Sequence, residues 1–426
     1  MRILYVCQYY PPEMGAPAAR ASELASHWVR AGHDVTVLTG FPNHPTGTLD
    51  PGYRSRFWRG VCREEIDGTK IVRTWLLPYP NRKAYERILN YSSFCLSAAL
   101  TGSFVQQPDV VIATSPQLLV GLSGWWIAQI KDIPLIFEVR DLWPESLTGV
   151  GLGSQNSALA KVLGRIAGFL YKHCNHLVVV TPAFKDFLVS NWNVSAEKIS
   201  IVENGVEPEL FAPGDSQGQK AQLGLEGKFV VSYIGTMGMA HGLTTILATA
   251  ARLQHELPNV IFLLVGEGAD KERLVALAAE RNLTNIRFVS QQPRSKIPGI
   301  IQASDLCLVL LKKAAVFETV IPTKMLEFMS CGRPILLGVE GQARRIMEDA
   351  DAGVFVQPES DSELAQKIRF MYDSAAMCER MGQNGRQYIL NNLSREQTAA
   401  KYLRLLERLL GSPTVASEKA DSSALG

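Results

Sequence analysis

The strand–helix pattern of the chain restarts within residues 207–234, E-P-E-L-F-A-P-G-D-S-Q-G-Q-K-A-Q-L-G-L-E-G-K-F-V-V-S-Y-I. The part up to residue 227 holds two prolines and four glycines, a composition typical of a linker. The apolar run at 229–234 then has the length and the valine content of a buried strand. One series of strands and helices therefore ends near residue 202, and a second begins at residue 229.

Ten short apolar runs are expected to form strands covered on both faces, because they are rich in Val, Ile and Leu without polar alternation. They lie at 3–6, 35–39, 110–113, 135–139, 177–180, 229–234, 261–265, 286–289, 306–310 and 334–337. Helical patterns separate them at 18–31, 159–173, 243–256, 271–281, 296–303 and 362–372. This alternation predicts an α/β fold with two Rossmann-like, doubly wound domains that face a cleft.

The restart also sets the expected domain boundaries. Residues 1–205 are predicted to form one Rossmann-like domain and residues 206–385 a second. A helix at 386–410 is expected to return to the first domain, and the small, polar residues 411–426 are expected to be a disordered tail. Two such domains joined by a linker favour a nucleotide in the cleft between them.

Composition narrows the class of protein. The chain has 426 residues, 46% hydrophobic and 20% charged, which is typical of a globular protein with two or three domains. The net charge of +2 argues against a nucleic-acid partner. Seven scattered cysteines without a C-x-x-C pair argue against a zinc or disulfide framework and favour a reducing, cytoplasmic location.

The loop after the first strand is a candidate anion site. A helix begins near Ala18, directly after a loop of small residues, and the first amides of a helix lack partners and carry partial positive charge. Gly15 would let the backbone approach a phosphate or a sugar. An ordinary strand-to-helix turn is equally compatible with these residues. The G-x-G-x-x-G fingerprint is absent, which disfavours a dehydrogenase.

Five motifs occur in an order that is specific for one family. They are Y-Y-P-P-E-M-G-A-P-A-A-R at 9–20, A-G-H-D-V-T-V-L-T-G-F-P-N-H-P-T-G at 31–47, F-E-V-R-D-L-W-P-E-S at 137–146, V-E-N-G-V-E-P-E-L-F at 202–211 and I-P-T-K-M-L-E-F-M-S-C-G-R-P-I at 321–335. Together they resemble glycosyltransferase family 4, retaining enzymes of the GT-B architecture, from residue 1 to about residue 410. The most similar branch transfers fucose-type or N-acetylfucosamine-type sugars in surface polysaccharide assembly, such as lipopolysaccharide or exopolysaccharide.

The resemblance implies that residues 1–205 are the acceptor-side domain and residues 206–385 the nucleotide-sugar-binding domain. It also implies a donor site at the last motif. Pro322 and Thr323 suit a helix N-terminus, where Lys324 and free amides would meet the diphosphate and Glu327 would accept hydrogen bonds from the ribose. A capped surface helix is the competing interpretation. The family has a glutamate where this chain has Thr319, so either Glu318 takes its catalytic place or backbone amides at 320–321 do.

A second departure lies in the loop after the strand at 229–234. Many members of the family carry an arginine and a lysine there, whereas this chain has Thr236 and His241 after Gly235. We expect Lys324 to supply the missing charge and the loop to supply backbone contacts. His241 is expected either to add a proton-dependent hydrogen bond or to cap a helix.

Further candidates follow other strands. Arg140 and Asp141 are candidate catalytic residues, with Arg140 free to pair with Glu138 or Asp141 or to touch substrate. Asp141 and Glu145, together with Thr114 and Ser115, are candidates for the acceptor side, although a structural salt-bridge cluster is an alternative. Arg294 is expected near the nucleotide or, alternatively, in a solvated loop.

No metal site and no cofactor beyond a UDP- or GDP-linked co-substrate are expected. Asp349 and Asp351 form a D-x-D, but they precede an ordinary helix-to-strand loop. Residues 82–105 combine a basic edge with an uncharged run, which favours either a peripheral membrane contact at the inner face of the cytoplasmic membrane or a core helix. A saccharide acceptor, lipid-linked as the branch implies, completes the expected partners.

The predicted activity is therefore metal-independent, retaining transfer of a sugar from a nucleotide sugar. A nucleotide-sugar 2-epimerase of the same fold is one alternative, since it would share the donor site but lack an acceptor. A non-catalytic scaffold that binds nucleotide sugar is the other, because Thr319, Thr236 and His241 depart from the family pattern.

Overall fold

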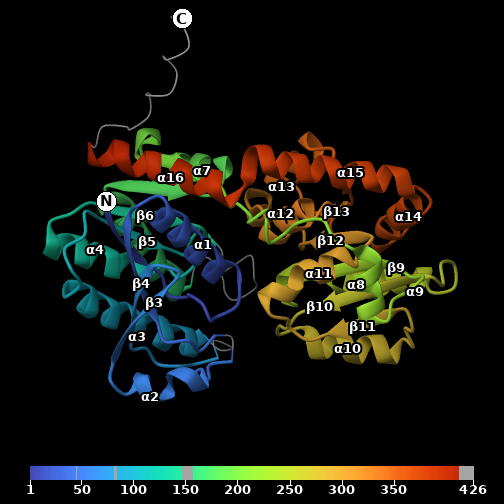
Figure 1. Cartoon of the computed structure of the whole chain (residues 1–426), viewed down its shortest axis with the longest axis horizontal. Coiled ribbons are helices and arrows are strands. Elements are labelled where there is room, and N and C mark those ends of the chain that lie inside the picture. The colour runs from blue at the N-terminus through green and yellow to red at the C-terminus, as the bar shows by residue number, and fades with distance from the viewer. Residues whose placement is uncertain (45, 81–83, 146–156, 412–426) are drawn as a thin grey trace, which may run out of the picture.

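The computed structural model describes residues 1–44, 46–80, 84–145 and 157–411, which form two α/β domains side by side (Figure 1). The first domain is built on an eight-stranded sheet of order β3-β4-β2-β1-β5-β6-β7-β8. Its strands are β1 (Arg2–Val6), β2 (Asp34–Gly40), β3 (Val61–Ile66), β4 (Thr69–Thr74), β5 (Val110–Thr114), β6 (Leu135–Val139), β7 (His176–Val179) and β8 (Ile199–Ile201). All neighbours are parallel except β3 and β4.

The second domain is built on a six-stranded parallel sheet of order β11-β10-β9-β12-β13-β14. Its strands are β9 (Phe229–Ile234), β10 (Val260–Val265), β11 (Ile286–Val289), β12 (Leu306–Leu310), β13 (Ile335–Gly338) and β14 (Gly353–Phe355). The predicted architecture, two doubly wound sheets, is confirmed.

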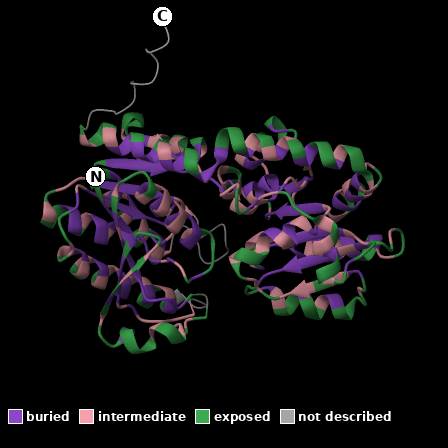
Figure 2. Cartoon of the chain, in the orientation of Figure 1, coloured by how far each residue is buried: buried purple, intermediate pink, exposed green. Residues whose placement is uncertain are grey.

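Helices cover both sheets, so the central strands are buried while the edge strands β3, β11 and β14 are partly exposed and the outer helix faces are exposed (Figure 2). The main helices are α1 (Ala16–Arg30), α3 (Ala84–Ser103), α4 (Val120–Lys131), α6 (Ala158–His173), α7 (Pro182–Trp192), α8 (Ser216–Leu223), α9 (Thr244–Leu253), α10 (Lys271–Glu280), α11 (Ile297–Gln302), α12 (Thr323–Ser330), α13 (Gln342–Asp349), α14 (Asp361–Tyr372), α15 (Ala375–Tyr388) and α16 (Arg395–Leu410).

The apolar-run criterion missed the β3–β4 hairpin. Strand β3 reads V-C-R-E-E-I and lies at the edge of the sheet, so it carries polar residues that a strand covered on both faces would not. The two strands are joined by a tight turn in which Asp67 and Gly68 both have positive φ, at 50° and 75°. The short strand β8 was also not among the predicted runs.

Two connections differ from the sequence interpretation. The linker-like segment 207–227 contains helix α8, which packs against α11 of the second domain. The helix expected at 386–410 is two helices, because α15 ends at Tyr388, a π-turn follows at Ile389–Leu393, and Ser394 caps α16. A parallel bridge between Val206 and Ser394 shows that the chain passes between the domains twice at one place.

Helix α16 returns to the first domain and packs on α1, as expected (Figure 1). Trp28 contacts Tyr5 on one side and Tyr402 on the other. The Tyr5 and Trp28 rings are tilted by 57° with centroids 5.4 Å apart, and the Trp28 and Tyr402 rings meet edge to face at 5.2 Å. Tyr402 and Leu406 are fully buried, and burying one large apolar side chain contributes roughly 1.5–3 kcal/mol. The chain terminus therefore fastens the second domain to the first. Of the expected tail, residues 412–426 lie outside the described part of the chain.

Candidate active site

The carboxyl-end loops of the two sheets meet at the domain boundary. The hydroxyl of Thr181, which follows β7, donates to the carbonyl of Thr319 at 2.9 Å. Val320 packs against the core of the first domain. In open α/β sheets ligands bind beyond the carboxyl ends of the strands, so this boundary is the expected place for substrate.

Lys324 lies in the first turn of α12 and directs its ammonium toward the turn after β9. Its Nζ is buried without a hydrogen-bond partner and lies 4.0 Å from the centroid of the Tyr233 ring. A Cβ added at Gly235, where φ is 143°, would come within 2.8 Å of that Nζ. Burial lowers the pKa of Lys324 to about 7, against the opposing effect of Glu327. The ammonium is therefore poised to gain from a bound anion.

Pro322 and Thr323 form the start of this helix. Pro322 is the N-cap residue with extended backbone, and Thr323 is the first helical residue. No side chain caps the helix, so the first amides of α12 stay available to a ligand. This arrangement puts free helix amides on the same turn as the Lys324 ammonium.

His241 and Thr236 lie in the loop after β9. The Nδ1 of His241 lies 3.3 Å from the Leu310 carbonyl, and burial together with the Lys324 charge lowers the pKa of His241 to about 3. This shift favours the neutral imidazole at physiological pH, and the proton-dependent hydrogen bond to a ligand stays a prediction. Thr236 is exposed, and its carbonyl accepts a hydrogen bond from the Tyr233 hydroxyl at 2.7 Å.

Glu327 and Arg294 form an ion pair rather than separate surface groups. The Nη1 of Arg294 donates to Oε1 of Glu327 at 2.9 Å, and its Nη2 donates to Oε1 of Glu23 on α1 at 2.5 Å. Its guanidinium also lies 4.9 Å from the centroid of the Phe211 ring. Burial raises the pKa of Glu327, and Arg294 opposes this effect. The Arg294 side chain is therefore held in ion pairs, whereas its neighbours Pro293, Ser295 and Lys296 are exposed to solvent.

Arg140, Thr114 and Ser115 form a second cluster at the ends of β5 and β6. The backbone N–H of Arg140 donates to Oγ of Ser115 at 2.7 Å, and its Nε is buried without a hydrogen-bond partner. All three residues line a small cavity that also includes Tyr9 and Pro17 from the loop and first turn at α1. Burial, together with the neighbouring charge of Arg20, lowers the pKa of Arg140.

Of the alternatives for Arg140, pairing with Glu138 is not seen, because Glu138 is held by another arginine. Arg20 of α1 approaches Oε1 of Glu138 to 2.5 Å, and the hydroxyls of Thr114 and Tyr5 donate to Oε2. Burial would raise the pKa of Glu138, but Arg20 and Arg140 together hold it below the usual value. The buried carboxylate therefore joins α1 to the strand ends.

The remaining first-domain candidates lie beside this cluster. Gly15 is the N-cap of α1 with φ of 142°, a conformation that favours glycine. Burial raises the pKa of Asp141 to about 6, so its carboxylate is mostly ionised at neutral pH. Burial also raises the pKa of the half-buried Glu145. The motif residue that follows, Ser146, lies outside the described residues.

Comparison with known proteins identifies the family. Residues 15–205 match the glycosyl transferase 4-like domain, and residues 215–388 match the group 1 glycosyl transferases. The two matches together span most of the chain. The chain belongs to the family 4 glycosyltransferases.

Three individual proteins show how far the similarity extends. The chain is 25% identical over 414 residues to the putative colanic acid biosynthesis glycosyl transferase WcaI of Escherichia coli K12, a match that covers 95% of this chain and 99% of WcaI. Its fold is similar to that of sucrose-phosphate synthase from Thermosynechococcus elongatus, with a TM-score of 0.78 and 18% identity. The match covers 97% of this chain and 100% of the synthase. The fold is also similar to that of Anabaena HepE in complex with UDP-glucose, with a TM-score of 0.71 and 16% identity. This match covers 96% of this chain and 100% of HepE.

Glu318 does not join the Lys324 cluster of this family 4 enzyme. It is exposed and lines a separate cavity of about 280 Å³ together with Lys312, Lys313 and Glu340. The next residue, Thr319, accepts a hydrogen bond from the Thr181 hydroxyl through its backbone carbonyl. Glu318 as a substitute for the family glutamate stays a prediction without a contact to support it.

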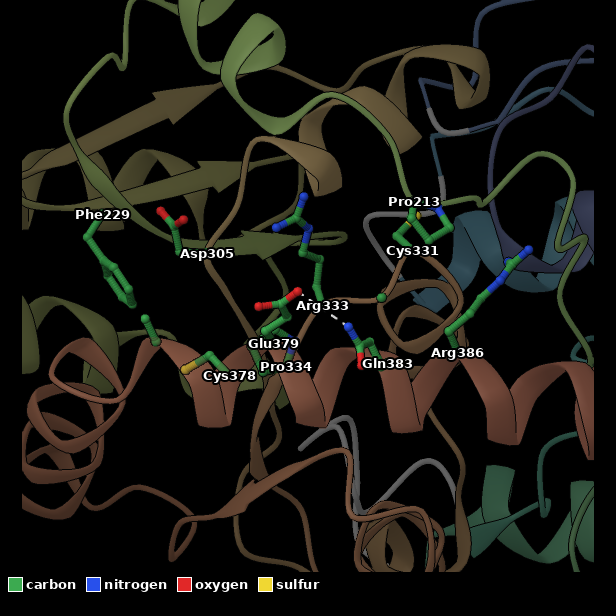
Figure 3. Close-up of a pocket in the computed structure, with 12 residues that line it drawn as sticks. Pro213, Phe229, Asp305, Cys331, Arg333, Pro334, Cys378, Glu379, Gln383 and Arg386 are labelled. Atoms are coloured by element: carbon green, nitrogen blue, oxygen red, sulfur yellow. Dashed lines mark hydrogen bonds between the residues drawn. The ribbon is translucent and has the colours of Figure 1, made fainter.

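Two other features lie away from the cluster. A cavity of about 540 Å³ opens at the amino ends of β9, β12 and β13, lined by Phe229, Asp305 and Pro334 among others (Figure 3). It is at the opposite edge of the sheet from Gly235.

Within the described ranges no group of three His, Cys, Asp or Glu residues could hold a metal ion. Of the D-x-D pair, the Asp351 carboxylate accepts a hydrogen bond from Asn384.

The sequence interpretation missed three contributors to the site. Tyr233 underlies the Lys324 ammonium, Arg20 holds Glu138, and Glu23 holds Arg294. Arg20 and Glu23 are three residues apart on α1, a spacing that places them on one face of a helix. That spacing was the available signal for the last two, whereas nothing in the sequence marks Tyr233.

Proposed function

We propose that this glycosyltransferase moves a sugar from a UDP- or GDP-linked donor to a lipid-linked saccharide acceptor in surface polysaccharide biosynthesis. The donor class is supported by the UDP-glucose bound in the similar Anabaena HepE structure. The pathway is supported by the E. coli relative, whose name assigns it to colanic acid biosynthesis. The similar WaaG structure belongs to a glycosyltransferase of lipopolysaccharide biosynthesis.

The unpartnered ammonium of Lys324 is the observation that carries this proposal. Burying a cation without a partner costs free energy unless a ligand supplies the opposite charge. A diphosphate placed between the amides of α12 and the turn at Gly235 would supply it. The same group becomes the leaving group, so charge stabilisation would grow as the glycosyl–phosphate bond breaks.

The neighbouring groups take complementary roles in this mechanism. Glu327, held by Arg294, would accept hydrogen bonds from the ribose hydroxyls. Arg140 would contact the leaving diphosphate or donor sugar, and Asp141 would hold the acceptor hydroxyl. In the proposal the acceptor attacks the face that the diphosphate leaves, which retains configuration, and Lys324 and the helix amides supply the positive charge without a metal.

A peripheral membrane contact completes the proposal. The faces of α3 and α4 leave large apolar side chains in solvent, with Leu96 67% exposed and Phe104, just beyond α3, 83% exposed; Leu100, Trp126 and Ile130 are also exposed. These two helices pack side by side in the first domain. Among the described helices, none is both long and apolar enough to cross a bilayer. The basic residues expected at 82–83 lie outside the described part.

Vesicle sedimentation tests the membrane contact. Replacing Leu96 and Leu100 by Asp should release the protein from phosphatidylglycerol vesicles, because two apolar side chains would no longer enter the interface. Val275→Asp on α10 is the matched control, since Val275 is an exposed apolar residue of the second domain. Equal sedimentation of both variants would contradict the contact.

Thermal unfolding with UDP-, GDP-, ADP- and dTDP-sugars tests the donor site. A ligand at about 100 times its dissociation constant stabilises by ~2.7 kcal/mol, which is roughly a 5–10 °C rise in Tm. The shift should be selective for one base and unchanged by EDTA. A 2-epimerase would instead isomerise the donor without acceptor, and a scaffold would bind it without turnover. Absence of any shift would contradict the donor site.

A further inference from the structure

Glu23 belongs to helix α1 of the first domain, but its carboxylate binds Arg294 at the proposed nucleotide site of the second domain. Its Oε1 accepts from Nη2 of Arg294 at 2.5 Å, and its Oε2 accepts from Nε of Arg395 at 2.8 Å. Glu23 is 11% exposed and Arg395 is 2% exposed, so the contact between them is well shielded from water, whereas Arg294 is 32% exposed. Each oxygen of Glu23 thus has its own arginine.

Arg294 makes the connection from Glu23 to the donor site. One arm of its guanidinium binds Glu23 and the other binds Oε1 of Glu327, the proposed ribose ligand. The face of the guanidinium rests on Phe211 of the segment between the domains. A planar guanidinium held at both arms and on one face has little rotational freedom, and it therefore fixes the Glu327 carboxylate.

The position of Glu23 is itself fixed by the chain crossing. Arg395 is the first residue of α16, directly after Ser394, which bridges to Val206 where the chain passes between the domains. A change in the relative position of the domains would move Glu23 and Arg294 apart, since they belong to different domains. The contact is thus formed only when the domains are close.

We propose that Glu23 is a positioning residue that acts through Arg294 to hold Glu327 ready for the ribose of the donor, so that approach of the two domains strengthens nucleotide binding. This inference rests on the proposed function, because it assigns the ribose to Glu327. Glu23 itself makes no contact with the nucleotide in the proposal. Its effect on affinity must therefore disappear when Glu327 is changed.

A double-mutant cycle measures this dependence directly. UDP and GDP are titrated by calorimetry into the full-length wild type, Glu23→Gln, Glu327→Gln and the double variant. Glu23→Gln should weaken the better-bound nucleotide about tenfold in the wild-type background and change it less than twofold in the Glu327→Gln background. A purely structural role of Glu23 would weaken binding equally in both backgrounds and would overturn the inference.

Two further variants make the cycle robust. Glu23→Gln has a side effect, because it also leaves Arg395 without its carboxylate. Arg294→Lys breaks the link between Glu23 and Glu327 in a second way, because an ammonium cannot span both carboxylates in the guanidinium geometry. Arg294→Lys replaces Glu23→Gln in the cycle if Glu23→Gln does not unfold cooperatively. Glu207→Gln is the matched control, because it alters another carboxylate contact of α1, the 2.9 Å contact with His27, without touching Arg294.

The outcomes separate the two proposals. Wild-type binding of UDP or GDP with unchanged affinity in Glu23→Gln or Arg294→Lys overturns the role of Glu23 and leaves the proposed function standing. No binding of either nucleotide by the wild type overturns the proposed function and this inference together. Unchanged affinity in Glu207→Gln, with the loss confined to the bridge variants, supports the inference.

Discussion

Replacing Lys324 by Met should remove most of the activity while stabilising the fold. The Nζ of Lys324 is buried without a hydrogen-bond partner, and burial lowers its pKa from 10.5 to about 7. Methionine has a similar length and keeps apolar contact with the Tyr233 ring, but it removes the buried ammonium. The residue thus contributes to function at the expense of stability.

The size of the stabilisation depends on pH in a predictable direction. Between pH 7 and 10.5 the unfolded chain holds a proton on Lys324 that the folded chain lacks, so wild-type stability rises with pH by up to about 1.4 kcal/mol per unit. Below pH 7 both states hold the proton, and the cost of burying the ammonium is complete. The advantage of Lys324→Met is therefore largest below pH 7 and shrinks by about 2 kcal/mol between pH 7 and 9.

Scanning calorimetry at pH 6.5, 7, 8 and 9 measures this advantage. The difference in Tm between variant and wild type should shrink by roughly 4–8 °C from pH 7 to 9. Lys296→Met, which removes an exposed lysine next to the Arg294 loop, is the control and should show no such trend. Turnover with the donor selected by thermal unfolding should fall about a hundredfold or more in Lys324→Met.

Two results would refute the reasoning about Lys324. A lower Tm of the variant at every pH would mean that the ammonium stabilises the fold and is not an unpaired buried charge. Wild-type turnover in the variant would mean that Lys324 does not face the leaving diphosphate.

Three further predictions concern the same clusters. Arg20→Met should lower the free energy of unfolding by about 3–5 kcal/mol, seen as a lower Tm, because Glu138 would stay buried without its cation. Gly235→Ala should weaken UDP or GDP binding about tenfold in calorimetry, since the new Cβ would lie 2.8 Å from Nζ of Lys324. Gly238→Ala is the control and should have a smaller effect, because its new Cβ would meet its neighbours only at ordinary van der Waals distances. Affinity for the nucleoside diphosphate should fall above pH 7 by at most about tenfold per unit, because binding requires the protonated Lys324, and titrations in two buffers of different ionisation enthalpy should show proton uptake.

Much of the fold could be predicted because its strands are covered on both faces. Such strands are continuous apolar runs, and β6, β9, β11 and β12 have the predicted bounds. The β3–β4 hairpin could not be found in this way, since an edge strand tolerates charged residues and its alternation is weak. The break at Ser394 was also missed, because the apolar spacing continues across the π-turn.

The sequence predicted which loops carry the candidate site residues, but not which charged side chains form ion pairs with one another. Lys324, Glu327 and Arg294 were expected at the donor site from the family resemblance and from their places at a helix start or after a strand. The structure joins the last two in one ion pair. Glu138 was one of the partners considered for Arg140, beside Asp141 and substrate. Arg20, 118 residues away, takes that carboxylate instead.

The sequence by itself determined the two-domain α/β architecture, the family and the loops that carry the charged residues, because periodicity and motif order are local properties of the chain. Only the tertiary structure decided which charges are paired. It gives Glu327 an arginine partner, joins that arginine to Glu23 of the other domain, and leaves Lys324 without a partner. The physical reason is that burial and ion pairing depend on side chains from distant segments, whose positions are set only when the two domains pack together.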